Sequence, residues 1–149
     1  MSQRPDFIRK GYKYPPVSLP VLDEVRLRQA LFLLAVVQLL LGAFLVIAPG
    51  PFGDNIAPYG SGADDHFLRD VGTFYLAMGA ALLLAVRRPS WRVPVLFLVA
   101  VQYALHTINH LVDIADTDPG WLGPFNFVSL LLLTLIVGWV LHGAARLAR

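Results

Sequence analysis

A run of polar side chains interrupts an otherwise apolar stretch of this sequence, and its spacing suits shared chemistry. The run consists of His106, Asn109, His110 and Asp113, with Gln102 just before it. At 3.6 residues per turn of an α-helix, these positions fall on one face. Because polar groups are costly in hydrocarbon, that face is expected to contact protein, water or a ligand rather than lipid. The run predicts where a site lies, but it names no reaction.

A second polar stretch carries His66 and Asp70 at i, i+4 spacing, so their side chains share a helix face. His106 and His110 have the same spacing, which allows both rings to face one ion, as in helical zinc and iron sites. If the apolar segments fold up and down across a bilayer, the two stretches come to the same level. The sequence therefore predicts that they converge at one end of a bundle.

The metal hypothesis follows from these residue types. The predicted ligands of a metal ion are His66, Asp70, His106, His110 and Asp113, and the predicted contacts of another cofactor are His66, Asp70, His106, Asn109 and His110. The chain has no cysteine, which excludes thiolate sites, Fe–S clusters and disulfides. Nitrogen and oxygen ligands then leave Zn, Fe, Mn or Cu as the ions to consider. No H-E-x-x-H motif is present, which disfavours a zinc peptidase.

Two alternatives to a metal site stay open. The histidines and carboxylates can satisfy one another in a structural network inside the bundle. They can also contribute to a small-ligand pocket, in which Tyr75, Tyr103, Trp121 and Phe125 form walls around a quinone or a lipid head and a histidine donates to a carbonyl oxygen.

The elements that must position these groups are four long apolar segments. They cover about residues 29–48, 67–86, 93–113 and 124–145, each close to the ~20 residues that cross a bilayer. Charged residues make up 15% of the chain, against about 25% in a soluble domain. We therefore expect an all-α, polytopic integral membrane protein, an up-down bundle of four transmembrane helices over 27–149, preceded by a basic, proline-containing tail over 1–26.

The distribution of basic residues predicts the orientation. Every Lys and Arg except Arg69 precedes the first span, separates the second from the third, or follows the fourth. The positive-inside rule then places both termini in the cytoplasm. We expect the membrane to be the inner membrane of a bacterial cell. The net charge of +2 is explained by this topology, so no nucleic-acid partner is needed.

Helix packing is also predicted from residue size. Ala77, Ala81 and Ala85 form a small-residue stripe on the second span, and Gly72 and Gly79 favour the same close approach of a neighbouring helix. Gln38, alone near the middle of the first span, is expected to hydrogen-bond a neighbouring helix.

The ends of two spans carry local signals. Asp64 and Asp65 stand just before the second span, where an acidic cap complements the positive end of the helix dipole. The sequence Ala48-Pro49-Gly50-Pro51 is expected to end the first span.

The stretch Arg69-Asp70-Val71-Gly72-Thr73-Phe74-Tyr75-Leu76-Ala77-Met78-Gly79, followed by His106 and Asn109-His110, resembles the DoxX-like group of small bacterial four-span membrane proteins. The resemblance covers the four spans and leaves out residues 1–26. It implies a quinone-linked redox context, because the founding type is similar to a subunit of a quinone-linked oxidoreductase. It supplies no catalytic residues.

For function, we expect an accessory or structural subunit of a membrane assembly, with other membrane subunits or further copies of the chain as partners in the bilayer. The alternative is a metal- or quinone-binding redox protein that acts through the same polar site. The sequence does not decide whether the protein is an enzyme.

Overall fold

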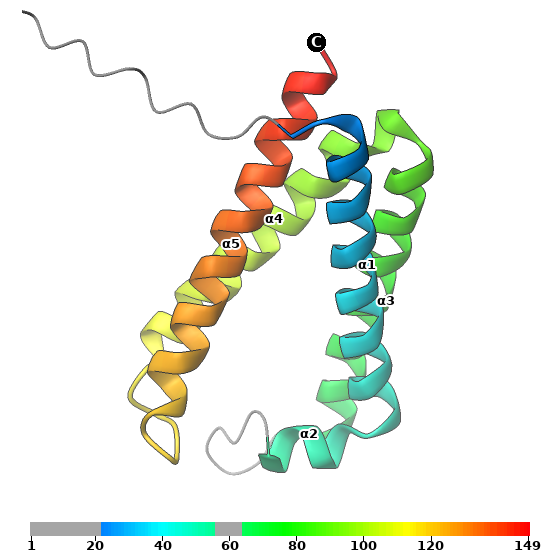
Figure 1. Cartoon of the computed structure of the whole chain (residues 1–149). Helices are drawn as coiled ribbons and strands as arrows, with labels where there is room; N and C mark the ends of the chain where they lie inside the picture. The colour runs from blue at the N-terminus through cyan, green and yellow to red at the C-terminus, as the bar shows by residue number, and fades with distance from the viewer. Residues whose placement is uncertain (1–21, 56–63) are drawn as a thin grey trace, which may run out of the picture.

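A computed structural model describes residues 22–55 and 64–149. Within these ranges the chain forms five helices and no strand: α1 (Glu24–Ile47), α2 (Pro49–Asn55), α3 (Asp65–Arg87), α4 (Pro89–Val112) and α5 (Leu122–Leu147). All except the short α2 are long and apolar enough to cross a membrane. The four long helices run alternately up and down (Figure 1). The predicted four-span, all-α bundle of a multi-pass membrane protein is confirmed, whereas most of the predicted tail, residues 1–21, lies outside the described residues.

The helix ends follow from local chemistry. The Asp64 carboxylate accepts a hydrogen bond of 2.7 Å from the backbone N–H of His66, which is the acidic cap predicted at the start of α3. The apolar span α1 ends at Ile47, close to the expected position, but the chain resumes at once as α2. Proline is tolerated at the first position of a helix, where its missing N–H is not needed, so Pro49 begins α2 instead of leaving a loop.

α1 and α3 pack closely along their length because glycines remove side chains from the contact. A Cβ placed on Gly42 of α1 would lie 2.8 Å from the carbonyl oxygen of Gly72, and a Cβ on Gly79 would lie 2.6 Å from Leu39 Cγ. Gly72 and Gly79 therefore do what the sequence predicts. The alanine stripe does so only in part, because Ala85 is buried but Ala77 is exposed.

The bundle has two chemically different ends. We call the end with the C-terminus and the α3–α4 connection the basic end, and the end with α2 and the α4–α5 connection the acidic end (Figure 1). The basic end carries Arg26, Arg28, Arg87, Arg88, Arg92, Arg146 and Arg149, and the acidic end carries Asp54, Asp64, Asp65, Asp70, Asp113, Asp116 and Asp118.

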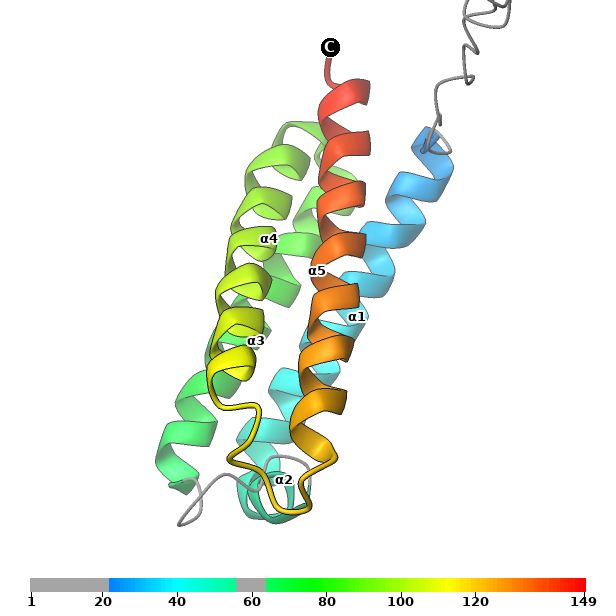
Figure 2. The same ribbon diagram turned by 90° about the vertical axis from the view of Figure 1, so that its left-hand side faces the viewer.

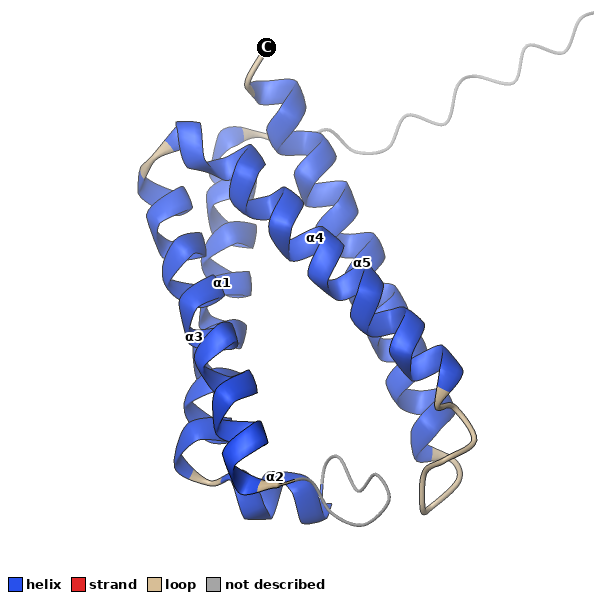
Figure 3. Ribbon diagram, turned by 180° about the vertical axis from the view of Figure 1, so that it is seen from behind, coloured by secondary structure: helices blue, strands red, loops and turns tan. Residues whose placement is uncertain are grey.

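The four long helices share a core only in the half toward the basic end. That core combines residues of every long helix, among them Leu31, Leu82, Leu96 and Val137, which are fully buried. A second, smaller cluster toward the acidic end is built around Leu45, Leu68 and Tyr75, and it draws on α1, α2 and α3 alone. Two helix pairs, α1 with α3 and α4 with α5, therefore meet at the basic end and separate toward the acidic end (Figures 1 and 3).

At the basic end, an ion pair connects the helix pair α1/α3 with the helix pair α4/α5. Arg92 of α4 donates two hydrogen bonds of 2.7 Å to the two carboxylate oxygens of Glu24 on α1, and its Nε donates at 3.3 Å to the carbonyl oxygen of Ala85 on α3. The Arg92 side chain is only 9% exposed, whereas that of Glu24 is 53% exposed. We call this contact the Arg92–Glu24 clamp. Beside it, Leu22 packs where a Cβ of Gly143 would stand, which brings α5 against the start of α1.

α4 and α5 lie side by side over most of their length (Figure 2). In the half toward the acidic end they are held by polar contacts rather than by a core. The hydroxyl oxygens of Thr107 and Thr134 lie 2.9 Å apart across the pair, and each also lies 2.8 Å from a carbonyl oxygen of its own helix. Because a hydroxyl has one proton to donate, one threonine donates across the pair while the other donates to its own helix. In the α4–α5 connection, the Thr117 hydroxyl accepts a hydrogen bond of 2.9 Å from the N–H of Gly123.

Candidate functional site

The predicted site residues of α3 form a local pair near the acidic end. His66 Nε2 lies 3.6 Å from Asp70 Oδ2, and both side chains are largely exposed, by 82% and 60%. The Asp70 carbonyl oxygen accepts a hydrogen bond of 2.7 Å from the Thr73 hydroxyl, which is a contact within the helix. The shared face predicted for these residues is present, and it is open to the surroundings.

The predicted residues of α4 form a second local pair. The rings of His106 and His110 meet edge to face with centroids 4.8 Å apart, and both residues are partly buried. Asn109 is exposed, and the exposed Asp113 is the residue that ends the helix. The i, i+4 spacing therefore brings the two rings together as expected, but the rings contact each other instead of facing a shared ion.

The two pairs do not join into one group. Among residues 22–55 and 64–149, no set of three or more His, Asp or Glu side chains is close enough to hold a metal ion. The reason is the separation of the helix pairs, which carries the start of α3 away from the end of α4 (Figure 3). Metal binding stays a prediction for the five residues named for it, His66, Asp70, His106, His110 and Asp113. In this arrangement, further ligands from outside the described residues would be needed to complete a site.

The aromatic walls expected for a ligand pocket also fall into two places. Tyr75 and Tyr103 are buried near the middle of the bundle, where the helix pairs begin to separate. Trp121 and Phe125 stand at the acidic end of α5, both exposed, with ring centroids 5.9 Å apart. The four rings do not enclose one cavity, so the quinone hypothesis is left with the residues around Tyr75.

The middle of the bundle contains a polar feature that the sequence does not reveal. Gln38 of α1 is fully buried, and within the described structure neither atom of its side-chain amide has a hydrogen-bond partner. The expected bond to a neighbouring helix is therefore not made. Gln102 of α4 hydrogen-bonds to Tyr75 of α3, but its buried Oε1 is likewise without a partner there. Buried amide atoms without partners are costly, which marks this level of the bundle as unusual.

From Gln102 the polar face of α4 continues to the acidic end. Gln102, His106 and His110 follow one another at four-residue intervals, so they line one side of the helix. We call them the α4 polar stripe. Toward the acidic end no hydrophobic core covers this half of α4, where Thr107 alone is buried among residues 104–112. Along α5, residues 124–136 contain no buried residue at all.

The clamp between Arg92 and Glu24 is a contact that the sequence patterns do not predict. The charge distribution assigns Arg92 to the residues that set the membrane orientation, and the expected third span begins just after it. A usable signal is nevertheless present, because Glu24 is the chain's single glutamate and stands among arginines.

Comparison with known proteins gives a family but no activity. Residues 26–142 match the model of a family described as "Domain of unknown function (DUF4345)". No curated protein and no solved structure matches the chain. The resemblance to DoxX-like proteins therefore stays a prediction.

Proposed function

Because the chain belongs to this DUF4345 family, whose description names no activity, we propose a function from the geometry of the described residues. The protein is an accessory subunit of a bacterial inner-membrane assembly. It receives a transmembrane segment of a partner protein against the halves of α4 and α5 that lie toward the acidic end.

The observation that carries this proposal is the α4 polar stripe on an uncovered part of the membrane domain. His106 and His110 lie within a membrane-spanning helix, and Asn109 beside them is exposed. Polar side chains in hydrocarbon are costly, and they commonly hydrogen-bond across helix–helix contacts. Since α1 and α3 form their own cluster at this level, we expect a helix from another chain to contact His106 and the exposed Asn109.

The proposed orientation places the basic end in the cytoplasm. Among the described residues, Arg69 alone of the basic side chains lies toward the acidic end. Arginine and lysine concentrate on the cytoplasmic side of membrane proteins. The α4 polar stripe then lies in the outer half of the bilayer, and the clamp lies at the cytoplasmic surface.

A photocrosslinking experiment in living cells tests the proposal. A photoreactive amino acid replaces His106 in one variant and Ile108 in its matched control, which is at nearly the same depth but about 200° around α4. We expect a crosslinked protein of defined mass from position 106 and a much weaker product from position 108. A product of twice the chain's own mass would identify the partner segment as a second copy. Equal yields from both positions, or crosslinks to lipid alone, would overturn the proposal.

The edge-to-face contact of His106 and His110 favours a second candidate, a metal- or quinone-dependent redox protein. Two imidazoles on one helix supply part of a ligand set, which a partner would have to complete. Elemental analysis of protein purified with its partners tests for a bound metal ion. Less than about one tenth of an equivalent of Zn, Fe, Mn or Cu would rule out the metal hypothesis. For quinone, an affinity that stays the same in His106→Ala and His110→Ala removes these residues from consideration.

A further inference from the structure

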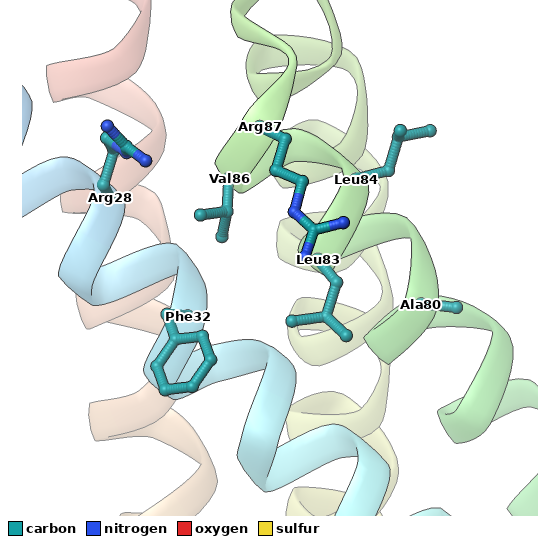
Figure 4. Close-up of a pocket in the computed structure, with 7 residues that line it drawn as sticks. All are labelled: Arg28, Phe32, Ala80, Leu83, Leu84, Val86 and Arg87. Carbon is teal, nitrogen blue, oxygen red and sulfur yellow. The ribbon is translucent and has the colours of Figure 1, made fainter.

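A groove opens between α1 and α3 near the basic end, away from His66, His106 and His110. Its volume is about 510 Å³, and it is lined by Arg28, Phe32, Ala80, Leu83, Leu84, Val86 and Arg87. Figure 4 shows Arg28 and Phe32 on α1 and the other five residues on α3. Apart from Val86, every residue of the lining is exposed, so the groove opens on the outer surface of this helix pair.

The two arginines of the groove have no fixed counterion. Within the described ranges, neither guanidinium forms a hydrogen bond or an ion pair with a carboxylate. Glu24 is one turn from Arg28 on the same helix, but both of its carboxylate oxygens are already bound by Arg92. The charge of Glu24 attracts Arg28 as well as Arg92, so the described part of the protein neutralises the two positive charges of the groove only in part.

The position of the charges relative to the apolar surface indicates what neutralises them. Arg28 and Arg87 stand near the ends of the membrane-spanning segments, where the lipid headgroups lie. Phe32 and Leu83 line the groove about one turn deeper, which is the depth at which acyl chains begin. The lining contains no acidic residue.

We propose that this groove is a binding site for a phospholipid with an anionic headgroup. Arg28 and Arg87 contact the phosphate and the headgroup from the two helices, and an acyl chain lies over Phe32 and Leu83. A free phosphate ion would use the arginines alone, so the apolar lining is what selects a lipid. A lipid bound here also bridges α1 and α3 at the outer surface of this helix pair.

The experiment is native mass spectrometry of the full-length protein released from mixed zwitterionic and phosphatidylglycerol nanodiscs. Loss of both groove charges in Arg28→Gln/Arg87→Gln is compared with Arg88→Gln/Arg146→Gln, which removes two exposed arginines of the same end from outside the groove. At about fivefold per arginine, the groove variant is expected to bind the anionic lipid about 25-fold more weakly than the wild type. The control should retain most of the wild-type affinity.

Two further measurements distinguish a bound lipid from a bound phosphate ion. Phe32→Ala leaves the charges in place and should still weaken lipid retention, whereas inorganic phosphate added in excess should not displace the lipid. Displacement by inorganic phosphate, or full retention of the lipid in Phe32→Ala, would overturn the proposal.

An equal loss of affinity in the control pair would overturn the proposal as well, because it would show only a general attraction of the basic end to anionic membranes. Gel filtration and circular dichroism confirm that each variant is folded. The single variants Arg28→Gln and Arg87→Gln, each expected to weaken binding about fivefold, replace the double variant if it does not fold.

Discussion

The Arg92–Glu24 clamp predicts that its two partners are unequal in their effect on stability. Glu24→Gln removes the carboxylate charge and leaves a guanidinium that is only 9% exposed, with a neutral amide in place of its counterion and with its bond to the Ala85 carbonyl oxygen. Arg92→Met removes the cation and leaves a carboxylate that is 53% exposed and can be hydrated. Glu24→Gln should therefore lower the free energy of unfolding more than Arg92→Met does.

The magnitudes follow from the burial of the charge that stays behind. Removing one partner of a fully buried ion pair costs about 3–5 kcal/mol, because the other charge is left uncompensated. Since the clamp is open to solvent on the Glu24 side, we expect about 2 kcal/mol for Glu24→Gln and about 1 kcal/mol for Arg92→Met. The double variant should lose less unfolding free energy than the two single variants together, because the second substitution removes a charge that the first has already left unpaired.

The assay is equilibrium unfolding of the purified protein in mixed micelles of a mild detergent and sodium dodecyl sulfate, followed by tryptophan fluorescence. Trp91 is adjacent to Arg92 and reports on this end of the bundle. Arg26→Gln is the matched control, because Arg26 pairs with Asp23 at 3.5 Å but both side chains are more than half exposed. Its free energy of unfolding should change by less than about 0.5 kcal/mol.

The reverse order, with Arg92→Met costing more than Glu24→Gln, would refute this reasoning. It would mean that Arg92 stabilises the bundle chiefly by packing its aliphatic stem or by its bond to Ala85. A loss in Arg26→Gln as large as that in Glu24→Gln would also refute it, since net charge at the basic end would then matter more than the clamp.

Two further changes test the packing of the bundle by the same unfolding assay. Gly42→Ala places a Cβ within 2.8 Å of the Gly72 carbonyl oxygen and should lower the free energy of unfolding by about 1–3 kcal/mol. Gly138→Ala should be neutral or slightly stabilising, because apart from its own helix backbone no atom lies within 4 Å of the added Cβ. Gln38→Met replaces an amide that has no partner among the described residues by an apolar side chain of similar shape, so the free energy of unfolding should rise by about 1 kcal/mol. A marked loss of stability in Gln38→Met would instead reveal a bound partner for that amide.

Much of the fold is predictable because hydrophobic length and charge distribution are properties of single segments. The four spans, their alternation and the acidic cap at Asp64 each depend on residues that are close in sequence. The role of Gly72 and Gly79 is predictable for the same reason, since only a small residue allows two helix backbones to approach.

The arrangement of the candidate site is not predictable in the same way. His66 with Asp70 and His106 with His110 follow from helical spacing, and both pairs are present. Whether the pairs meet depends on how α3 packs against α4 near the acidic end, and the sequence has no local signal for that angle. The angle is set by the main packing partners of these helices, because α3 packs chiefly against α1 and α4 packs chiefly against α5.

The one-sided core has a mechanical consequence for the surrounding bilayer. Because the helices share a core in one half and separate in the other, the molecule occupies a larger cross-section in the leaflet at the acidic end. A protein that is wider in one leaflet fits best where that leaflet is expanded, on the convex side of a curved membrane. The protein should therefore accumulate in membranes that curve toward the basic end, and lipid composition that alters curvature should shift its distribution.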